Sequence, residues 1–183
     1  MTTIIGLCGR AGSGKSSVAR YLREKHDAQV LSLAGPLKRM AIEIFGFTPE
    51  QVYGEADVKE TVDSRYGFSP RTAMQRLGQS ARDHLWAHVW IDALFRQIHE
   101  QSPYLAVVED VRYINEACQF HLHRQAHTIR IVCEDVPWSG DHPSEAEVDQ
   151  IPAAWLLGEV RGSRQAGLED LFEKVDALLA GVL

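Results

Sequence analysis

The amino-acid sequence predicts a three-layer α/β protein, with helices on both faces of a central parallel sheet. Apolar runs of strand length alternate with stretches of helical periodicity, and this alternation is typical of parallel sheets. The first apolar run, over 3–8, leads directly into a glycine-rich turn and then into a helical stretch, which is the order of elements around a phosphate-binding loop. These two observations together predict the fold class.

The glycine-rich turn has the spacing G-x-x-x-x-G-K-S, with Gly9, Gly14, Lys15 and Ser16 at the fixed positions. Glycines let successive backbone N–H groups point toward one anion, and the helix that follows adds the positive end of its dipole. The lysine of such a loop reaches the outer phosphates, and the serine hydroxyl binds Mg²⁺. We therefore expect ATP phosphates to be bound by Gly9, Ala11, Gly12, Ser13, Gly14, Lys15, Ser16 and Ser17.

The elements of the first half follow from apolar spacing and helix-start signals. After a first helix over 15–25, we expect a strand over 28–33, a helix from Pro36 to Phe45 and a short helix from Pro49. The stretch 46–70 is otherwise loose, which favours a substrate-covering loop. A helix pair is predicted over 71–85 and 86–99.

The second half continues the same alternation. Strands are expected over 104–108, 128–133 and 155–160, and helices over 114–122 and 168–179. Between 134 and 150 the sequence is polar and irregular, which is typical of a mobile lid.

Length and composition limit the class of protein. A chain of 183 residues suits one domain over 1–183, and a net charge of −6 argues against binding to nucleic-acid polymers or anionic membranes. No apolar run approaches the length of a membrane span.

Three cysteines without C-x-x-C spacing predict neither a disulfide framework nor a zinc site, which favours a reducing cytoplasm. We expect small-molecule partners, and a homodimer stays open.

Two carboxylates end the apolar strand at 104–108. In this kind of fold an Asp at the end of such a strand, downstream of the phosphate loop, holds Mg²⁺, and we favour Asp110 over its neighbour Glu109. Adjacent residues of an extended strand point to opposite faces, so one of the two faces the metal. The other interpretation is that both carboxylates cap the next turn.

Basic side chains near the same end of the sheet are candidates for a second phosphate. Arg112 would lie on the side of Asp110 if the chain stays extended, and its planar guanidinium suits bidentate phosphate recognition. Arg71 begins a helix beside Pro70, and Lys38 follows the second strand closely. Spacings of five and six do not put Arg71, Arg76 and Arg82 all on one helix stripe.

Motifs along nearly the whole chain resemble the tailed-phage type of deoxynucleoside monophosphate kinase, within the P-loop kinases. The matching segments, in order, are Gly9–Ser16, Leu33–Lys38, Phe45–Gly46, Thr48–Glu50, Lys59–Glu60, Ser69–Arg71, Gln75–Gly78 with Arg82, Trp90, Asp110–Tyr113, Asn115–Ala117 and His142–Glu145.

The resemblance implies Mg²⁺-dependent transfer of the γ-phosphoryl of ATP to a deoxynucleoside monophosphate. It also implies a monophosphate-binding helical region over 46–100 and a lid over 134–150. On this interpretation Lys15, Arg112 and Asp110 are catalytic, and Ser16 and Asp110 bind the metal. The monophosphate side is lined by Lys38, Arg71, Gln75, Arg82 and Arg112.

The sequence departs from the family pattern at three places. Gln79 stands where a Thr is common, Val132–Cys133 stand where a strand usually ends in Arg, and the turn after 160 lacks the usual Asn. The adenine contacts are therefore unassigned, and the lid arginine is one of Arg124, Arg130, Arg161 and Arg164.

Other functions share the phosphate loop. Another small P-loop kinase, acting on a nucleoside or a coenzyme precursor, is the nearest alternative. A GTP-driven regulatory module would need an Asn-Lys-x-Asp motif and a D-x-x-G, which the chain lacks. An ATPase would place a glutamate after the metal Asp, where Val111 stands.

Overall fold

The computed structural model describes residues 1–136 and 143–183, with backbone alone for 143–146. These residues form two compact units, one of 1–32 with 96–183 and one of 33–95. The first unit carries the sheet, and the second is helical.

The sheet of the first unit is parallel and has five strands in the order β2-β3-β1-β4-β5. Its strands are β1 (Thr3–Cys8), β2 (Gln29–Leu31), β3 (Leu105–Val111), β4 (Ala126–Cys133) and β5 (Leu156–Gly162). The central strand β1 has the predicted bounds. The expected α/β class with a parallel sheet is confirmed.

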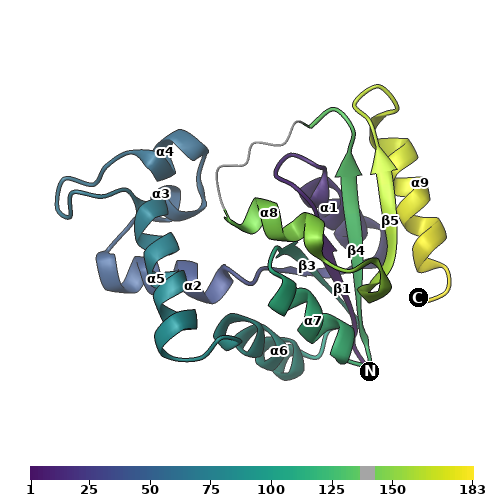
Figure 1. The fold of residues 1–183 in the computed structure, drawn as a ribbon, viewed down its shortest axis with the longest axis horizontal. Coiled ribbons are helices and arrows are strands. Elements are labelled where there is room, and N and C mark those ends of the chain that lie inside the picture. Colours follow the sequence, from purple (N-terminus) through teal and green to yellow (C-terminus); the bar gives the residue numbers. More distant parts are fainter. Residues whose placement is uncertain (137–142) are drawn as a thin grey trace. The chain divides into compact units, whose positions relative to one another are not determined.

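Helices α1 (Lys15–His26) and α9 (Gly167–Leu179) cover one face of the sheet, and α9 lies along β5 in Figure 1. Alternating residues of β1 face this layer, because Ile5 and Leu7 belong to the same buried cluster as Val18 of α1 and Val175 of α9. The layer is a continuous apolar core that holds β1 against α1 and α9.

The opposite face carries α7 (Ile114–Leu122). Phe120 of this helix packs so closely on Gly6 that a Cβ there would come within 2.8 Å of the Phe120 ring. Gly6 is therefore required for α7 to lie against β1. Helix α8 (Pro143–Gln150) and the short helix η1 (Ala153–Trp155) precede β5 in this unit.

The prediction of irregular structure over 134–150 is wrong for residues 143–150, which form helix α8. The residues 137–142, including His142 of the quoted motif, lie outside the described residues. In the parts of the chain that the structure describes, no helix has the length and apolar character needed to span a membrane.

The second unit contains α2 (Gly35–Phe45), α3 (Pro49–Tyr53), α4 (Ala56–Glu60) and α5 (Pro70–His84), and α6 (Val89–Gln101) starts in it. Helix α4 was not predicted, since its five residues are too few for a periodic pattern. Helix α2 packs on α5, and a small core forms around Ala41, Phe47, Val52 and Ala73.

Ser69 begins α5 by accepting a hydrogen bond of 3.2 Å from the Thr72 amide, as an N-cap residue does. The indole nitrogen of Trp90 donates to the Gly78 carbonyl at 3.1 Å, which ties α6 to the middle of α5. Helix α5 is thus held at its start and at its centre.

Candidate active site

The phosphate loop lies between the end of β1 and the start of α1, as its motif requires. Gly9 has φ +141° and Gly14 has φ +100°, values that L side chains rarely adopt. A Cβ at Gly9 would also collide with the carbonyl oxygen of Ile131 on the neighbouring strand β4. The glycines of the motif are therefore required by the path of the backbone.

Lys15 is buried, with 8% of its surface exposed, although its side chain ends in a charge. Its ammonium donates to the loop's own carbonyls, at 2.7 Å to Gly9 and 2.6 Å to Arg10. Burial of an ammonium without acceptors would be costly, so these bonds hold it inside the loop. The sequence places Ser16 next to it, in the first turn of α1.

Asp110 is oriented by a neighbouring strand. The Ser32 hydroxyl, one residue past β2, donates a hydrogen bond of 2.7 Å to Asp110 Oδ2. Because β1 pairs with β3 in parallel and Cys8 is opposite Val111, the loop and Asp110 both lie at the carboxyl ends of the strands. Ligands bind at these ends in open α/β folds.

Arg112 is exposed just after β3, and its position depends on Glu116, for which the sequence motifs predict no role. The buried carboxylate of Glu116 accepts hydrogen bonds from the backbone amides of Arg112, at 3.0 Å, and Tyr113, at 3.1 Å. Glu116 thus fixes the turn that carries Arg112. An acidic residue at the third position of a helix is the signal that predicts this contact.

The other basic candidates lie in the second unit, on α2 and α5. Since 71, 75, 78 and 82 are spaced by four, three and four, Arg71, Gln75, Gly78 and Arg82 share one stripe of α5. The stripe faces α2 at its centre, because a Cβ at Gly78 would come within 3.1 Å of Leu37.

Two of these cations already contact other groups of the second unit. Arg71 Nε lies 3.2 Å from Glu60 Oε1, with both side chains exposed. The ammonium of Lys38, the residue after Leu37, lies 5.1 Å from the centre of the Tyr53 ring. An incoming phosphate would compete with Glu60 for Arg71.

Four arginines are candidates for the lid arginine. Of these, Arg130 contacts the C-terminal end of α8. Its side chain is only 14% exposed and donates to the carbonyls of Val148 and Ile151. Arg161 pairs with Glu159 at 2.7 Å, and Arg164 donates its backbone amide to Asp135. The Arg130 side chain thus joins β4 to the end of α8, and the Arg164 amide joins the chain after β5 to Asp135.

The Cys8 thiol and the Asp63 carboxyl have pKa values shifted from their ordinary ones. Burial raises the pKa of the Cys8 thiol to about 11, against the opposing effect of Arg130 and Lys15, so this thiol stays protonated. Hydrogen bonds from Arg65 hold the pKa of the Asp63 carboxyl well below its usual value. Cys8 is fully buried at the end of β1 and packs beside the phosphate loop.

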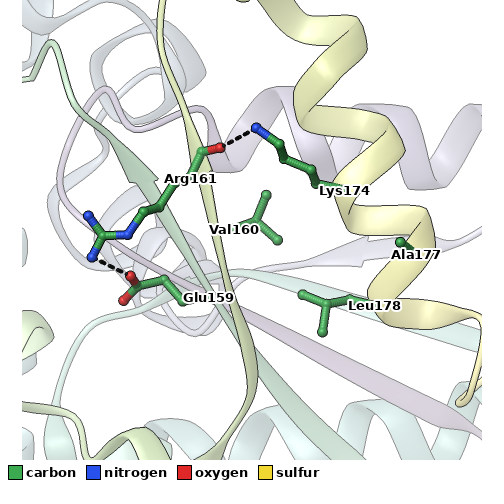
Figure 2. Close-up of a pocket in the computed structure, with 6 residues that line it drawn as sticks. All are labelled: Glu159, Val160, Arg161, Lys174, Ala177 and Leu178. Atoms are coloured by element: carbon green, nitrogen blue, oxygen red, sulfur yellow. Dashed lines mark hydrogen bonds and ion pairs between the residues drawn. The ribbon is translucent and has the colours of Figure 1, made fainter.

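An open groove of about 490 Å³ lies elsewhere, between β5 and α9. Figure 2 shows that Lys174 reaches the carbonyl of Arg161, at 3.0 Å, and that Arg161 turns to Glu159. None of the residues predicted to bind substrate lines this groove.

The chain has the P-loop kinase fold: a parallel sheet in the order β2-β3-β1-β4-β5, with a phosphate loop between β1 and α1. The dephospho-CoA kinase of Campylobacter jejuni has the same fold, with a TM-score of 0.51 over 100% of both chains and 9% identity. No protein-family model matches the chain.

Two relatives define the family. The chain is 34% identical to a protein of Acanthamoeba polyphaga mimivirus that is named as a candidate deoxynucleotide monophosphate kinase, over 81% of this chain and 83% of that one. It is 25% identical to the deoxynucleoside-5′-monophosphate kinase of Escherichia phage T5, over 87% and 89% of the two chains. The chain belongs to the deoxynucleoside monophosphate kinase family, which confirms the resemblance seen in the sequence.

Proposed function

We propose that the protein transfers the γ-phosphoryl group of ATP to the phosphate of a deoxynucleoside 5′-monophosphate. The observation that supports this most is the 34% identity, over most of both chains, to a protein named as a kinase of deoxynucleotide monophosphates. The phosphate loop and its buried lysine supply the ATP side of this reaction.

On the ATP side, the amides and side chains of 9–17 hold the phosphates, and Lys15 turns from the carbonyls of Gly9 and Arg10 to the outer phosphates. The ammonium then stabilises the charge of the migrating group. Because the loop is already curved, binding requires little reorganisation of its backbone.

Ser16 and Asp110 would hold Mg²⁺. Hydroxyl and carboxylate oxygens are the ligands that this ion prefers, and Ser32 already fixes the direction of the Asp110 carboxylate. When bound, Mg²⁺ neutralises charge on the β- and γ-phosphates.

Lys38, Arg71, Gln75 and Arg82, together with Arg112, form the acceptor set. The acceptor phosphate is already ionised at pH 7, so the reaction needs positioning and charge neutralisation rather than a strong general base. Arginine-rich recognition suits this task, because guanidinium groups bind phosphate oxygens in pairs.

We further propose one domain over 1–183, with 46–100 binding the acceptor and 134–150 covering the phosphates. The acidic net charge supports small-molecule rather than nucleic-acid partners, and three free thiols support a reducing cytoplasm, that of the host if a phage encodes the chain. Sedimentation of the purified protein tests for a homodimer.

A coupled ADP-release assay with Mg·ATP tests the proposed function. The acceptors are dAMP, dGMP, dCMP, dTMP and their ribose forms, with a control that lacks any acceptor. We expect ADP release to depend on one or more deoxynucleoside monophosphates. Equal ADP release without acceptor would indicate an ATPase, and no release with any acceptor would indicate a kinase for another substrate.

A further inference from the structure

The C-terminal half of α8 is held by three polar contacts from three other parts of the first unit. Glu147 accepts a hydrogen bond of 3.2 Å from the amide of Ile114, at the start of α7. Arg130 of β4 donates to two carbonyls at this end of α8, those of Val148 and Ile151. Val148 and Ile151 are both buried, so this end of α8 is anchored to α7 and to Arg130 of β4.

The third contact joins α8 to the phosphate loop. Arg10 donates to Asp149 Oδ2 from Nε, at 3.0 Å, and from Nη2, at 2.5 Å. A planar guanidinium with two N–H groups on one carboxylate is held in orientation as well as in place. Since Arg10 is the residue directly after Gly9, the ion pair fixes the first part of the loop.

Arg10 is also held through its backbone, because the Lys15 ammonium donates to the Arg10 carbonyl at 2.6 Å. When Lys15 turns toward bound phosphates, the Arg10 peptide loses this hydrogen bond. The side-chain ion pair with Asp149 does not involve Lys15 and can persist. The ion pair would therefore keep the Arg10 end of the loop in position when Lys15 no longer donates to the Arg10 carbonyl.

We infer that Asp149 is a positioning residue for nucleotide binding, acting through Arg10 to keep the phosphate loop in its binding shape. The inference rests on the proposed use of ATP. The Arg10 and Asp149 side chains are 35% and 42% exposed, so the ion pair is screened by water. Exposed pairs of this kind correspond to roughly a two- to fivefold change in an equilibrium constant.

Calorimetric titration with Mg·ATP tests the inference on the full chain. The variants are Asp149→Asn, Arg10→Gln and the double variant. Asp170→Asn is the matched control, because it removes the similarly exposed pair with Lys174 on α9. We expect each single variant to bind ATP about two- to fivefold more weakly. The double variant should be no weaker than the weaker single variant, because both changes break one interaction.

Steady-state kinetics separates positioning from a general loss of structure. We expect Asp149→Asn to raise KM for ATP and to leave KM for the acceptor unchanged, with a midpoint of thermal unfolding equal to that of Asp170→Asn. Equal ATP affinity in Asp149→Asn and Asp170→Asn would overturn the inference, as would additive losses in the double variant. A wild-type chain that binds no ATP would instead contradict the proposed function, and the inference with it.

Discussion

The Ser32 hydroxyl donates a hydrogen bond of 2.7 Å to Asp110 Oδ2, and this bond joins the ends of two neighbouring parallel strands. Ser32 follows β2, and Asp110 is near the end of β3, so the carboxylate is oriented by the strand beside its own. If Asp110 binds Mg²⁺ as proposed, Ser32 supports a metal ligand without touching the metal.

Replacing Ser32 by Ala is expected to raise the Mg²⁺ concentration for half-maximal activity by roughly tenfold, because groups that orient metal ligands affect metal affinity on this scale. Titration of Mg²⁺ at saturating ATP and acceptor measures the effect. Thr61→Ala is the control, since it also removes one hydroxyl hydrogen bond, to the Asp57 carbonyl. An unchanged Mg²⁺ requirement in Ser32→Ala would argue against Asp110 as the ligand.

Arg71→Ala is expected to raise KM for the deoxynucleoside monophosphate by about 10- to 100-fold, the effect of losing a hydrogen bond to a charged group. KM for ATP should stay the same. The measurement is steady-state kinetics with each substrate varied in turn.

Arg76→Ala is the matched control for Arg71, because it removes an arginine of the same helix that lies off the shared stripe, 5.9 Å from the Phe68 ring. It should leave both KM values unchanged. Equal effects of the two substitutions on the acceptor KM would contradict the assignment of the stripe.

The lowered pKa of Asp63 predicts that the folded chain loses stability in acid. Its carboxylate accepts hydrogen bonds from Arg65 Nε, at 2.9 Å, and Nη2, at 2.7 Å, which lower its pKa in the folded chain. A lowered pKa contributes stability above the unfolded value of about 3.9, and this contribution is lost as the pH falls below it. The midpoint of thermal unfolding should therefore fall less steeply with acid in Asp63→Asn than in the wild type. Parallel curves below about pH 4 would show that Asp63 makes no such contribution.

The central features of the fold could be predicted because their signals are local. The strand β1 is an uninterrupted apolar run, and the glycine spacing after it is required by the φ angles of Gly9 and Gly14. Helix α8 was missed because it is short and rich in polar residues, which gives little periodicity to detect.

The partners of the site residues could not be predicted, because they depend on proximity in space. Ser32 and Asp110 are 78 residues apart, and Arg10 and Asp149 are 139 residues apart. No pattern along the chain links such residues. The shared stripe of Arg71, Gln75 and Arg82, by contrast, follows from spacing alone once the helix is known to run from Pro70 to His84.

Substitution of Lys15 tests directly whether this chain acts as a deoxynucleoside monophosphate kinase. The wild type and Lys15→Ala are incubated with Mg·ATP labelled in the γ-phosphate and with each deoxynucleoside monophosphate, and the labelled products are separated by chromatography. We expect label in a deoxynucleoside diphosphate with the wild type and a loss of at least about a hundredfold in Lys15→Ala, whose folding is verified by circular dichroism. Label only in inorganic phosphate, or equal transfer by a folded Lys15→Ala, would contradict this expectation.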